Sequence, residues 1–387
     1  MESHMKSHPK QGFDRILFFT VIMLLAFGVL MVYSSSAFWC DHYKDGDHAW
    51  IFRNHLLRVG FALLAMVVVS KIDYHAYRKW VPFLLLGMIF LLILVLWKGV
   101  EVRGSTRFFR ILGLRFQPSE FTKLVVVLYF SSVLSKEVEK NIENTRAMIQ
   151  ALLLFLVSGL VLLEPDLGTA TIILSTGIVI FFLANIPWKI FFLTGTLAVG
   201  GIVLQALCLD HQKKQLLIFL NVITGKGLPH YQLTQSLVAL ASGGVLGAGY
   251  GNGNAKNLFL PQAFSDFILA TLGEEFGFIG MLVLFCLVGI VLWRGIHIAL
   301  HARDRYGALL AGGITSLFMI TALINAGVTV AFLPTTGVPF PFISYGGASL
   351  SIYLLGIGIL LNISKRKVTS YREFTTERGQ IRWPVYE

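Results

Sequence analysis

Charged side chains are scarce in this 387-residue chain. Asp, Glu, Lys and Arg together make up 14% of the residues, whereas hydrophobic residues make up 55%. The mean hydropathy is accordingly high, at +0.71. A water-soluble fold needs more charge than this to cover its surface. The composition therefore excludes a soluble globular protein and predicts a protein that lies in a lipid bilayer.

Cysteine is also rare, and acidic residues are fewer than basic ones. The three cysteines, Cys40, Cys208 and Cys286, show no CxxC or Cys/His spacing, which excludes a zinc site or a disulfide framework of the usual kinds. The 32 Lys and Arg exceed the 21 Asp and Glu, giving a net charge of +11. Because the basic residues lie between apolar runs, they indicate contact with anionic lipid or phosphate and not with nucleic acid.

Apolar stretches recur along the whole chain and predict an all-α polytopic membrane protein with about ten transmembrane helices. The first is too long for a signal-peptide core and lacks a convincing cleavage site, so it should remain as a span. We interpret residues 1–387 as a single membrane domain. The ten predicted spans are 16–37, 59–72, 81–97, 121–135, 147–163, 167–184, 190–207, 267–293, 307–325 and 348–363.

The distribution of Lys and Arg predicts the orientation of these spans. With the N-terminus in the cytoplasm, 19 of the 32 basic residues fall on the cytoplasmic side and 13 on the other. The positive-inside rule then places the tails 1–15 and 364–387 in the cytoplasm. It also predicts that residues 209–266, between the seventh and eighth spans, form a large extracytoplasmic loop.

One extracytoplasmic segment departs from that rule. Residues 98–123 alone hold six basic side chains: Lys98, Arg103, Arg107, Arg110, Arg115 and Lys123. Such a concentration is typical of a site that handles an anion. Arginines in a loop can also bind lipid headgroups or stay solvated, so both interpretations remain open.

Ionisable residues within or beside the spans are few, and each is a candidate functional residue because a charge in lipid is costly. Glu120 and Lys123 are three residues apart and share a helix face, either as a structural ion pair or with Lys123 as a phosphate contact. Asp166 follows Pro165 at a turn between two apolar runs. It suits a helix N-cap as well as it suits a ligand for a cation or a hydroxyl group.

The segment 209–266 is the largest one available to build a site over the membrane. It contains Gln232 and Gln235, and a glycine-rich stretch, 242–256, that ends at Lys256. This stretch lacks the ending of a P-loop, so it is either a flexible or re-entrant segment or a set of N–H groups that cradle a pyrophosphate. Asp266 closes the segment, as a general base or as the N-cap of the next helix.

Two further features lie beyond Asp266. Glu274 and Glu275 are too far along the same helix to form an acid/base pair with it, and we expect them to organise the cavity. Residues 332–347, which include Ser344, hold three prolines and three glycines between two spans. Such a segment cannot cross lipid as a helix, so it should be a loop or re-entrant element that lines a cavity.

Six motifs, in this order, resemble the SEDS family of peptidoglycan glycosyltransferases, which includes FtsW and RodA. They cover most of the chain, and the form of the segment around Asp266 is more similar to FtsW. Phe264 and Ser265 depart from the His-Thr pair of many relatives. The motifs are YSSSA (33–37), RGSTRFFRILGLRFQPSEFTKL (103–124), EPDLGTA (164–170), YQLTQSLVALASGGVLGAGYGNGNAK (231–256), LPQAFSDFILATLGEEFGFIG (260–280) and LPTTGVPFPFISYGGASL (333–350).

The resemblance implies a ten-helix protein of the bacterial cytoplasmic (inner) membrane with both termini in the cytoplasm. It implies polymerisation of lipid II into glycan strands during cell division, beside a class B penicillin-binding protein that cross-links them and other division proteins. Asp266 matches the carboxylate considered catalytic in the family. The implied substrate-binding residues are Glu120, Lys123, Asp166, Gln232 and Gln235, to which the patterns above add Lys256 and Ser344.

The resulting hypothesis is an inverting glycosyl transfer in which Asp266 takes the proton of an acceptor hydroxyl that displaces a lipid pyrophosphate. Arg103, Arg107, Arg110 and Lys123 would stabilise the leaving group, alone or with a divalent cation, Mg²⁺ or Mn²⁺. The alternatives are a flippase for lipid-linked precursors, a RodA-like elongation polymerase, and a scaffold for division partners. Absence of an inverted repeat weighs against the flippase.

Overall fold

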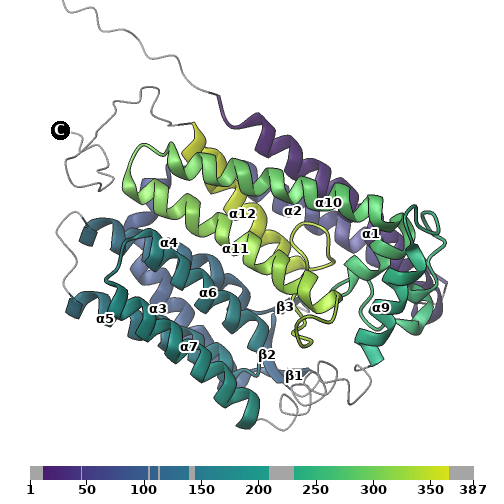
Figure 1. The fold of residues 1–387 in the computed structure, drawn as a ribbon, viewed down its shortest axis with the longest axis horizontal. Helices are drawn as coiled ribbons and strands as arrows, with labels where there is room; N and C mark the ends of the chain where they lie inside the picture. Colours follow the sequence, from purple (N-terminus) through teal and green to yellow (C-terminus); the bar gives the residue numbers. More distant parts are fainter. Residues whose placement is uncertain are drawn as a thin grey trace, which may run out of the picture.

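A computed structural model describes residues 12–44, 46–102, 105–111, 114–138, 144–208 and 231–365. Long helices run back and forth through the molecule and form one bundle (Figure 1). Ten of the described helices occupy the ten predicted spans. They are α1 (Arg15–Tyr43), α2 (Trp50–Lys71), α3 (Tyr74–Lys98), α4 (Pro118–Val138), α5 (Asn144–Leu163), α6 (Leu167–Leu183), α7 (Trp188–Cys208), α10 (Ile268–Leu300), α11 (Arg305–Thr329) and α12 (Gly347–Ser364).

The all-α membrane fold predicted from hydropathy is confirmed. Seven helices, α1, α2, α3, α5, α10, α11 and α12, are long and apolar enough to cross a bilayer by themselves, and α6 is a shorter apolar helix. Because α4 and α7 are not among those seven, the number of ten spans stays a prediction. A chain with this many apolar helices needs lipid around it, since each helix satisfies its own backbone hydrogen bonds.

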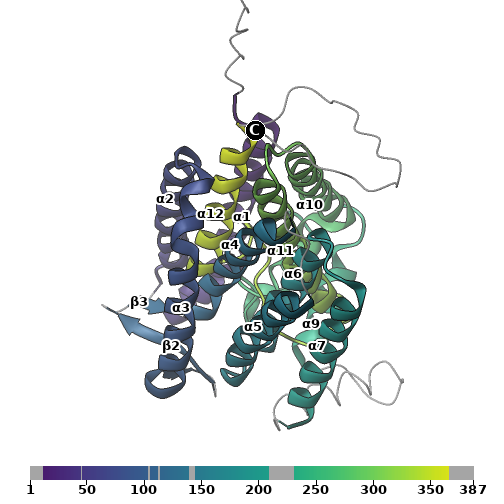
Figure 2. The same cartoon turned by 90° about the vertical axis from the view of Figure 1, so that its left-hand side faces the viewer.

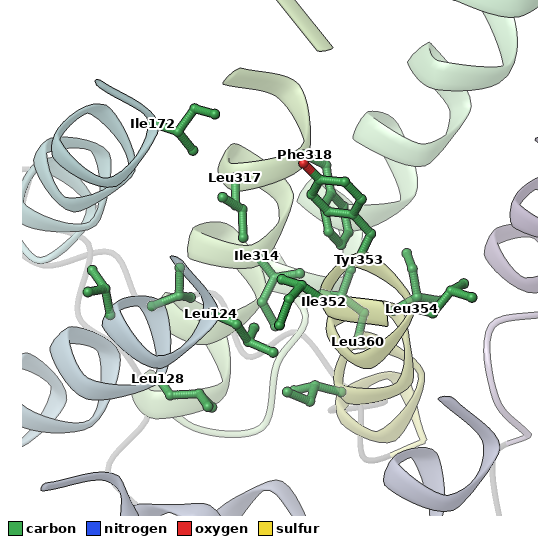
Figure 3. Close-up of a cluster of buried hydrophobic side chains, with 14 of the residues drawn as sticks. Leu124, Leu128, Ile172, Ile314, Leu317, Phe318, Ile352, Tyr353, Leu354 and Leu360 are labelled. Atoms are coloured by element: carbon green, nitrogen blue, oxygen red, sulfur yellow. The ribbon is translucent and has the colours of Figure 1, made fainter. Parts of the chain in front are cut away.

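Helices α11 and α12 form the centre of the bundle. Of the apolar window in α12, 78% is buried, against 22% in α3 and 17% in α10, which face outward. Leu124 of α4, Ile172 of α6, Leu317 of α11 and Tyr353 of α12 meet in the core between these helices (Figure 3). Close packing of these side chains fixes the positions of the four helices, and with them the segments that begin at their ends.

The first and last described helices meet at one end of the bundle. The backbone N–H of Asp14 donates to Ser364 Oγ at 3.0 Å, and Asp14 also forms a buried ion pair with Arg294 near the end of α10. The opposite end carries the sheet and the long connecting segments (Figure 2). We call this opposite end the loop end, and all of the functional residues predicted above that the structure describes lie toward it.

A small sheet joins α3 to α4 at the loop end, which hydropathy alone did not predict. Strands β1 (Val100–Val102), β2 (Ser105–Ile111) and β3 (Leu114–Phe116) pair in the order β1-β2-β3, antiparallel throughout. The basic segment 98–123 is therefore partly extended. Strand pairing fixes the direction of β2, the strand that carries Arg107 and Arg110.

The glycine-rich stretch folds back onto α10 and is held there by backbone hydrogen bonds. Gly277 interrupts α10 with φ 63° and ψ −162°, which frees backbone groups of that helix. The N–H groups of Ala248 and Gly249 donate to the carbonyls of Glu274 and Glu275, at 2.9 and 3.0 Å. These two N–H groups are therefore not open to a pyrophosphate. The structure supports the interpretation of this stretch as a re-entrant, docked segment.

Candidate active site at the loop end

Asp266 lies on a short irregular segment just before α10. Its side chain is partly exposed, and α10 begins at Ile268 with Phe267 as the N-cap residue, which makes no side-chain capping bond. The alternative of Asp266 as the N-cap is therefore wrong. A substrate group can reach a partly exposed carboxylate, whereas the carboxylate of Asp166, described below, is buried.

Three contacts fix the backbone around Asp266 against the segment that precedes α12. Asn325 of α11 donates through Nδ2 to the carbonyl of Asp266 at 2.7 Å and to that of Val338 at 2.6 Å. Ser344 Oγ donates to the carbonyl of Ser265 at 2.6 Å, and Tyr345 N donates to that of Phe264 at 2.9 Å. Ser344 thus positions the backbone beside Asp266. Its predicted contact with substrate stays a prediction.

Gly337 brings the other wall of the site close to the carboxylate. A Cβ at Gly337 would lie 3.7 Å from Asp266 Oδ2, and the φ of this residue is +66°. On its other side, the segment meets the start of α6, because a Cβ at Gly168 would lie 2.8 Å from the carbonyl oxygen of Thr336. Residues 336–338 therefore contact both Asp266 and the start of α6, the helix that Asp166 caps, so the two predicted site residues lie near the same segment.

Asp166 is the N-cap of α6 and is also tied to the basic segment. Its Oδ1 accepts from the N–H of Thr169 at 3.1 Å, and its Oδ2 accepts from Gln117 Nε2 at 3.0 Å. Arg107 Nη1 of β2 lies 3.7 Å from Oδ2. The cap interpretation of Asp166 is confirmed, and the same carboxylate holds Arg107, which remains 29% exposed, at the edge of the site.

Glu120 and Lys123 form a buried ion pair at the start of α4. Their charged atoms lie 2.9 Å apart, and both side chains are almost fully buried. Ser349 of α12 donates to Glu120 Oε2 at 2.6 Å, and the ammonium group of Lys123 lies over the ring of Tyr353. The structural interpretation of this pair is thus supported: it joins α4 to the first turn of α12.

Glu164 shares the turn with Asp166 but has a different environment. It is fully buried, and in the described part of the chain neither of its carboxyl oxygens has a hydrogen-bond partner. Burial, and then the nearby charge of Asp166, raise the pKa of Glu164 to about 8, against smaller opposing effects of Ser119 and Arg107. Glu164 is therefore mostly a neutral acid at neutral pH.

We expect Glu164→Gln to stabilise the protein above pH 5. Because the pKa of Glu164 is higher in the folded than in the unfolded chain, folding takes up a proton, and stability is lost as the pH rises toward about 8. Glutamine keeps the neutral shape and removes this loss. The midpoint of thermal unfolding in detergent should match that of the wild type at pH 4.5 and exceed it by several degrees at pH 8. Equal midpoints at both pH values would contradict the raised pKa.

Lys256 does not face the same place as Asp266. Its Nζ lies 2.6 Å from Glu275 Oε1 and 2.9 Å from Ser34 Oγ, in a buried cluster between α1, α10 and the π-helix η1 (Ala255–Phe259). Glu274 accepts from the backbone N–H of Asn254 at 2.8 Å. The two glutamates therefore organise the docked segment. The structure shows Lys256 in a structural ion pair, and its predicted contact with substrate stays a prediction.

The remaining predicted residues have less specific placements. Gln232 and Gln235 lie partly exposed on α9 (Tyr231–Gly243), which is tied to α11 by the hydrogen bond of Ser236 Oγ to the carbonyl of Thr329, at 2.7 Å. Arg110 is exposed on β2. Arg103 and residues 209–230 lie outside the described part of the chain, so their predicted roles stay predictions.

Sequence patterns missed two residues with structural roles, one beside Asp266 and one in the cluster around Lys256. Asn325 is a polar side chain in an otherwise apolar span, a signal that could have been found. Ser34 is in the YSSSA motif, and it donates to Glu275 Oε1 at 2.5 Å from a helix more than 200 residues away in sequence. Neither contact follows from spacing, because both depend on which helices become neighbours.

The described site therefore combines a partly exposed carboxylate with a cation on an adjoining strand. Asp266 could accept a proton from a hydroxyl group placed beside Gly337, and Arg107 could approach an anionic group while it stays paired with Asp166. Among the described residues, no three His, Cys, Asp or Glu side chains come together as metal ligands. The arrangement suits proton transfer to Asp266 beside a cation that can bind an anionic group.

Comparison with known proteins gives the relationships of the chain. A family model described as "Cell cycle protein", for FtsW, RodA and SpoVE, matches residues 14–369. Stage V sporulation protein E of Bacillus subtilis is 38% identical, over 91% of this chain and 97% of that protein. The probable peptidoglycan glycosyltransferase FtsW of Geobacter sp. strain M18 is 35% identical, over 92% of this chain and 98% of that protein.

Solved structures agree with this relationship. A chain of a peptidoglycan synthase complex, whose structure concerns the coordination of polymerization and crosslinking, has a TM-score of 0.73 and 26% identity, over 91% of this chain and 97% of that one. The rod shape determining protein RodA of Thermus thermophilus has a TM-score of 0.68 and 25% identity, over 92% and 98%. The resemblance stated from motifs is confirmed, and the chain belongs to the FtsW/RodA/SpoVE family of cell cycle proteins.

Proposed function

We propose that this protein is a peptidoglycan glycosyltransferase that polymerises lipid II, with Asp266 as the general base. The observation that carries the proposal is the placement of Asp266: a partly exposed carboxylate on a backbone segment held by Asn325 and Ser344. Relatives at about a third identity carry the name of this activity. A rigidly held base is what proton transfer to a side chain requires.

In this mechanism Asp266 removes the proton from the 4-hydroxyl of the acceptor sugar as its oxygen attacks the anomeric carbon of the donor. The bond between that carbon and the lipid pyrophosphate breaks on the opposite face, which inverts the anomeric centre. Pyrophosphate is a good leaving group, so cations suffice to stabilise it. Arg107 is the described cation nearest to this task, with Arg103 and Arg110 on the same segment. Lys123 would hold the start of α4 in place through its buried pair with Glu120.

The proposal includes a cellular setting. The protein would act in the bacterial cytoplasmic membrane, with both termini in the cytoplasm and the loop end outside, during cell division. A class B penicillin-binding protein would cross-link the strands, which is supported by the similarity to a chain of a complex that coordinates polymerization and crosslinking. The charge distribution and the meeting of Asp14 with Ser364 at one end support this orientation.

The experiment that tests the function uses the purified full-length protein in proteoliposomes with lipid II on both leaflets. Glycan product is scored by gel electrophoresis, and movement of labelled lipid II between leaflets is scored in the same vesicles. We expect glycan strands without movement of lipid II. Movement without product would support a flippase and would contradict the proposed function, whereas product formed without any partner would contradict a purely scaffolding role.

A further inference from the structure

Arg58 of α2 packs against the segment that leads into α12. Its guanidinium group lies 4.9 Å from the centre of the Tyr345 ring. A Cβ at Gly347, the first residue of α12, would lie 3.1 Å from Arg58 Cδ and 3.4 Å from Nε. Tyr345 is in turn bonded to Phe264, two residues before Asp266. Arg58 thus contacts Tyr345, which is hydrogen-bonded to the backbone segment that carries the proposed base.

Arg58 has no carboxylate within 4 Å in the part of the chain that the structure describes, unlike three other cations discussed above. Arg107 is held by Asp166, Lys123 by Glu120 and Lys256 by Glu275, at 3.7, 2.9 and 2.6 Å. An aromatic ring stabilises a guanidinium group without neutralising it. An arginine stacked in this way keeps its N–H fork available for a phosphate, the group that it fits in a bidentate manner.

A second polar side chain near Arg58 also lacks a partner. His55, one turn earlier on α2, is fully buried, and neither of its ring nitrogens has a hydrogen-bond partner among the described residues. The centre of its ring lies 5.7 Å from the centre of the Tyr345 ring. A buried imidazole normally forms at least one hydrogen bond, because leaving it without any costs free energy. An acceptor oxygen brought to this place would satisfy it.

The start of α12 is a third feature that favours an anion. The N-cap residue of this 18-residue helix is Gly346, and no side chain caps the helix there. The N-terminus of a helix carries partial positive charge and free N–H groups. With Arg58 against Gly347 and the unpartnered His55 nearby, the electrostatics at the start of α12 favour an anion.

We propose that Arg58, His55 and the start of α12 bind a phosphate group carried by a lipid at the loop end. Two lipids carry this chemistry: the polyprenyl pyrophosphate of the proposed substrate and an anionic phospholipid. The pyrophosphate version rests on the proposed function and deepens it, because it places a second anion site, besides Arg107, next to the backbone that carries Asp266. The phospholipid version stands without that function.

The test measures binding of two probes to the full-length protein in neutral detergent: undecaprenyl pyrophosphate and phosphatidylglycerol. We expect Arg58→Gln to weaken binding of at least one probe about tenfold, the loss of one charge-assisted contact. Gly347→Ala, which inserts a methyl group beside Arg58, should weaken it in the same direction. The matched controls are Arg53→Gln, an exposed arginine on the same helix that pairs with Asp47, and Gly60→Ala on that helix, whose Cβ would have no neighbour within 4 Å.

The outcomes separate the two sources and the two proposals. A loss for undecaprenyl pyrophosphate alone, with a raised KM for lipid II and a smaller change in kcat, assigns the site to the substrate. A loss for phosphatidylglycerol alone assigns it to a phospholipid. If Arg58→Gln binds both probes as Arg53→Gln does, the inference is overturned even when the wild type polymerises lipid II. If the wild type makes no glycan but binding still depends on Arg58, the proposed function fails and the site stands.

Discussion

Asp266→Asn should lower the rate of lipid II polymerisation by about 10²- to 10⁴-fold, the usual contribution of a positioned general base. Asparagine keeps the size of the side chain but cannot take a proton. Because the backbone of residues 264–266 is held by Asn325, Ser344 and Tyr345, the substitution should leave the segment in place. The measurement is the initial rate of glycan formation by purified protein, with the midpoint of thermal unfolding recorded for each variant.

Two further variants make this result specific. Asp266→Glu keeps the carboxyl group on a longer arm and should recover part of the rate. Asp41→Asn, which changes an exposed carboxylate at the end of α1, should behave as the wild type. A folded Asp266→Asn variant with the wild-type rate would remove the general-base role and leave the function to be explained by other residues.

Lys256→Met should destabilise the protein by about 3–5 kcal/mol, because it leaves the carboxylate of Glu275 buried without its cation. If Lys256 instead contacted substrate, as predicted from its place at the end of the glycine-rich stretch, the variant would raise KM and leave stability unchanged. Thermal unfolding in detergent and the KM for lipid II, measured on the same preparation, distinguish these roles.

The matched tests for this ion pair use its other partner and an exposed lysine. Lys256→Met combined with Glu275→Gln removes both charges and should recover most of the lost stability. Lys71→Met, at the exposed end of α2, should change the unfolding midpoint little. A single Lys256→Met variant as stable as Lys71→Met would show that the cluster with Ser34 is not needed to hold the docked segment.

The difference between Asp266 and Lys256 shows what motifs alone cannot predict, namely which polar residues are buried in ion pairs. Both residues lie in segments that match the family, and both are polar residues beside apolar spans. Only the structure shows that Lys256 is buried against Glu275, whereas Asp266 stays partly exposed. The reason is the position of α1, whose Ser34 meets α10 and closes over Lys256. Such a contact between distant helices leaves no pattern in either helix.

Hydropathy and charge by themselves determined that this protein is a helical membrane protein and where its long helices run, because a bilayer admits a spanning segment only if its side chains are apolar and its backbone is satisfied. Motifs determined the family. The tertiary structure alone decided which polar residues lie near one another. Gly168 lets the start of α6 approach residues 336–338, and Gly337 lets the same segment approach Asp266. It also decided which charges are paired, because pairing depends on which helix faces are packed together. Among the residues that the structure describes, Arg58 has no carboxylate partner.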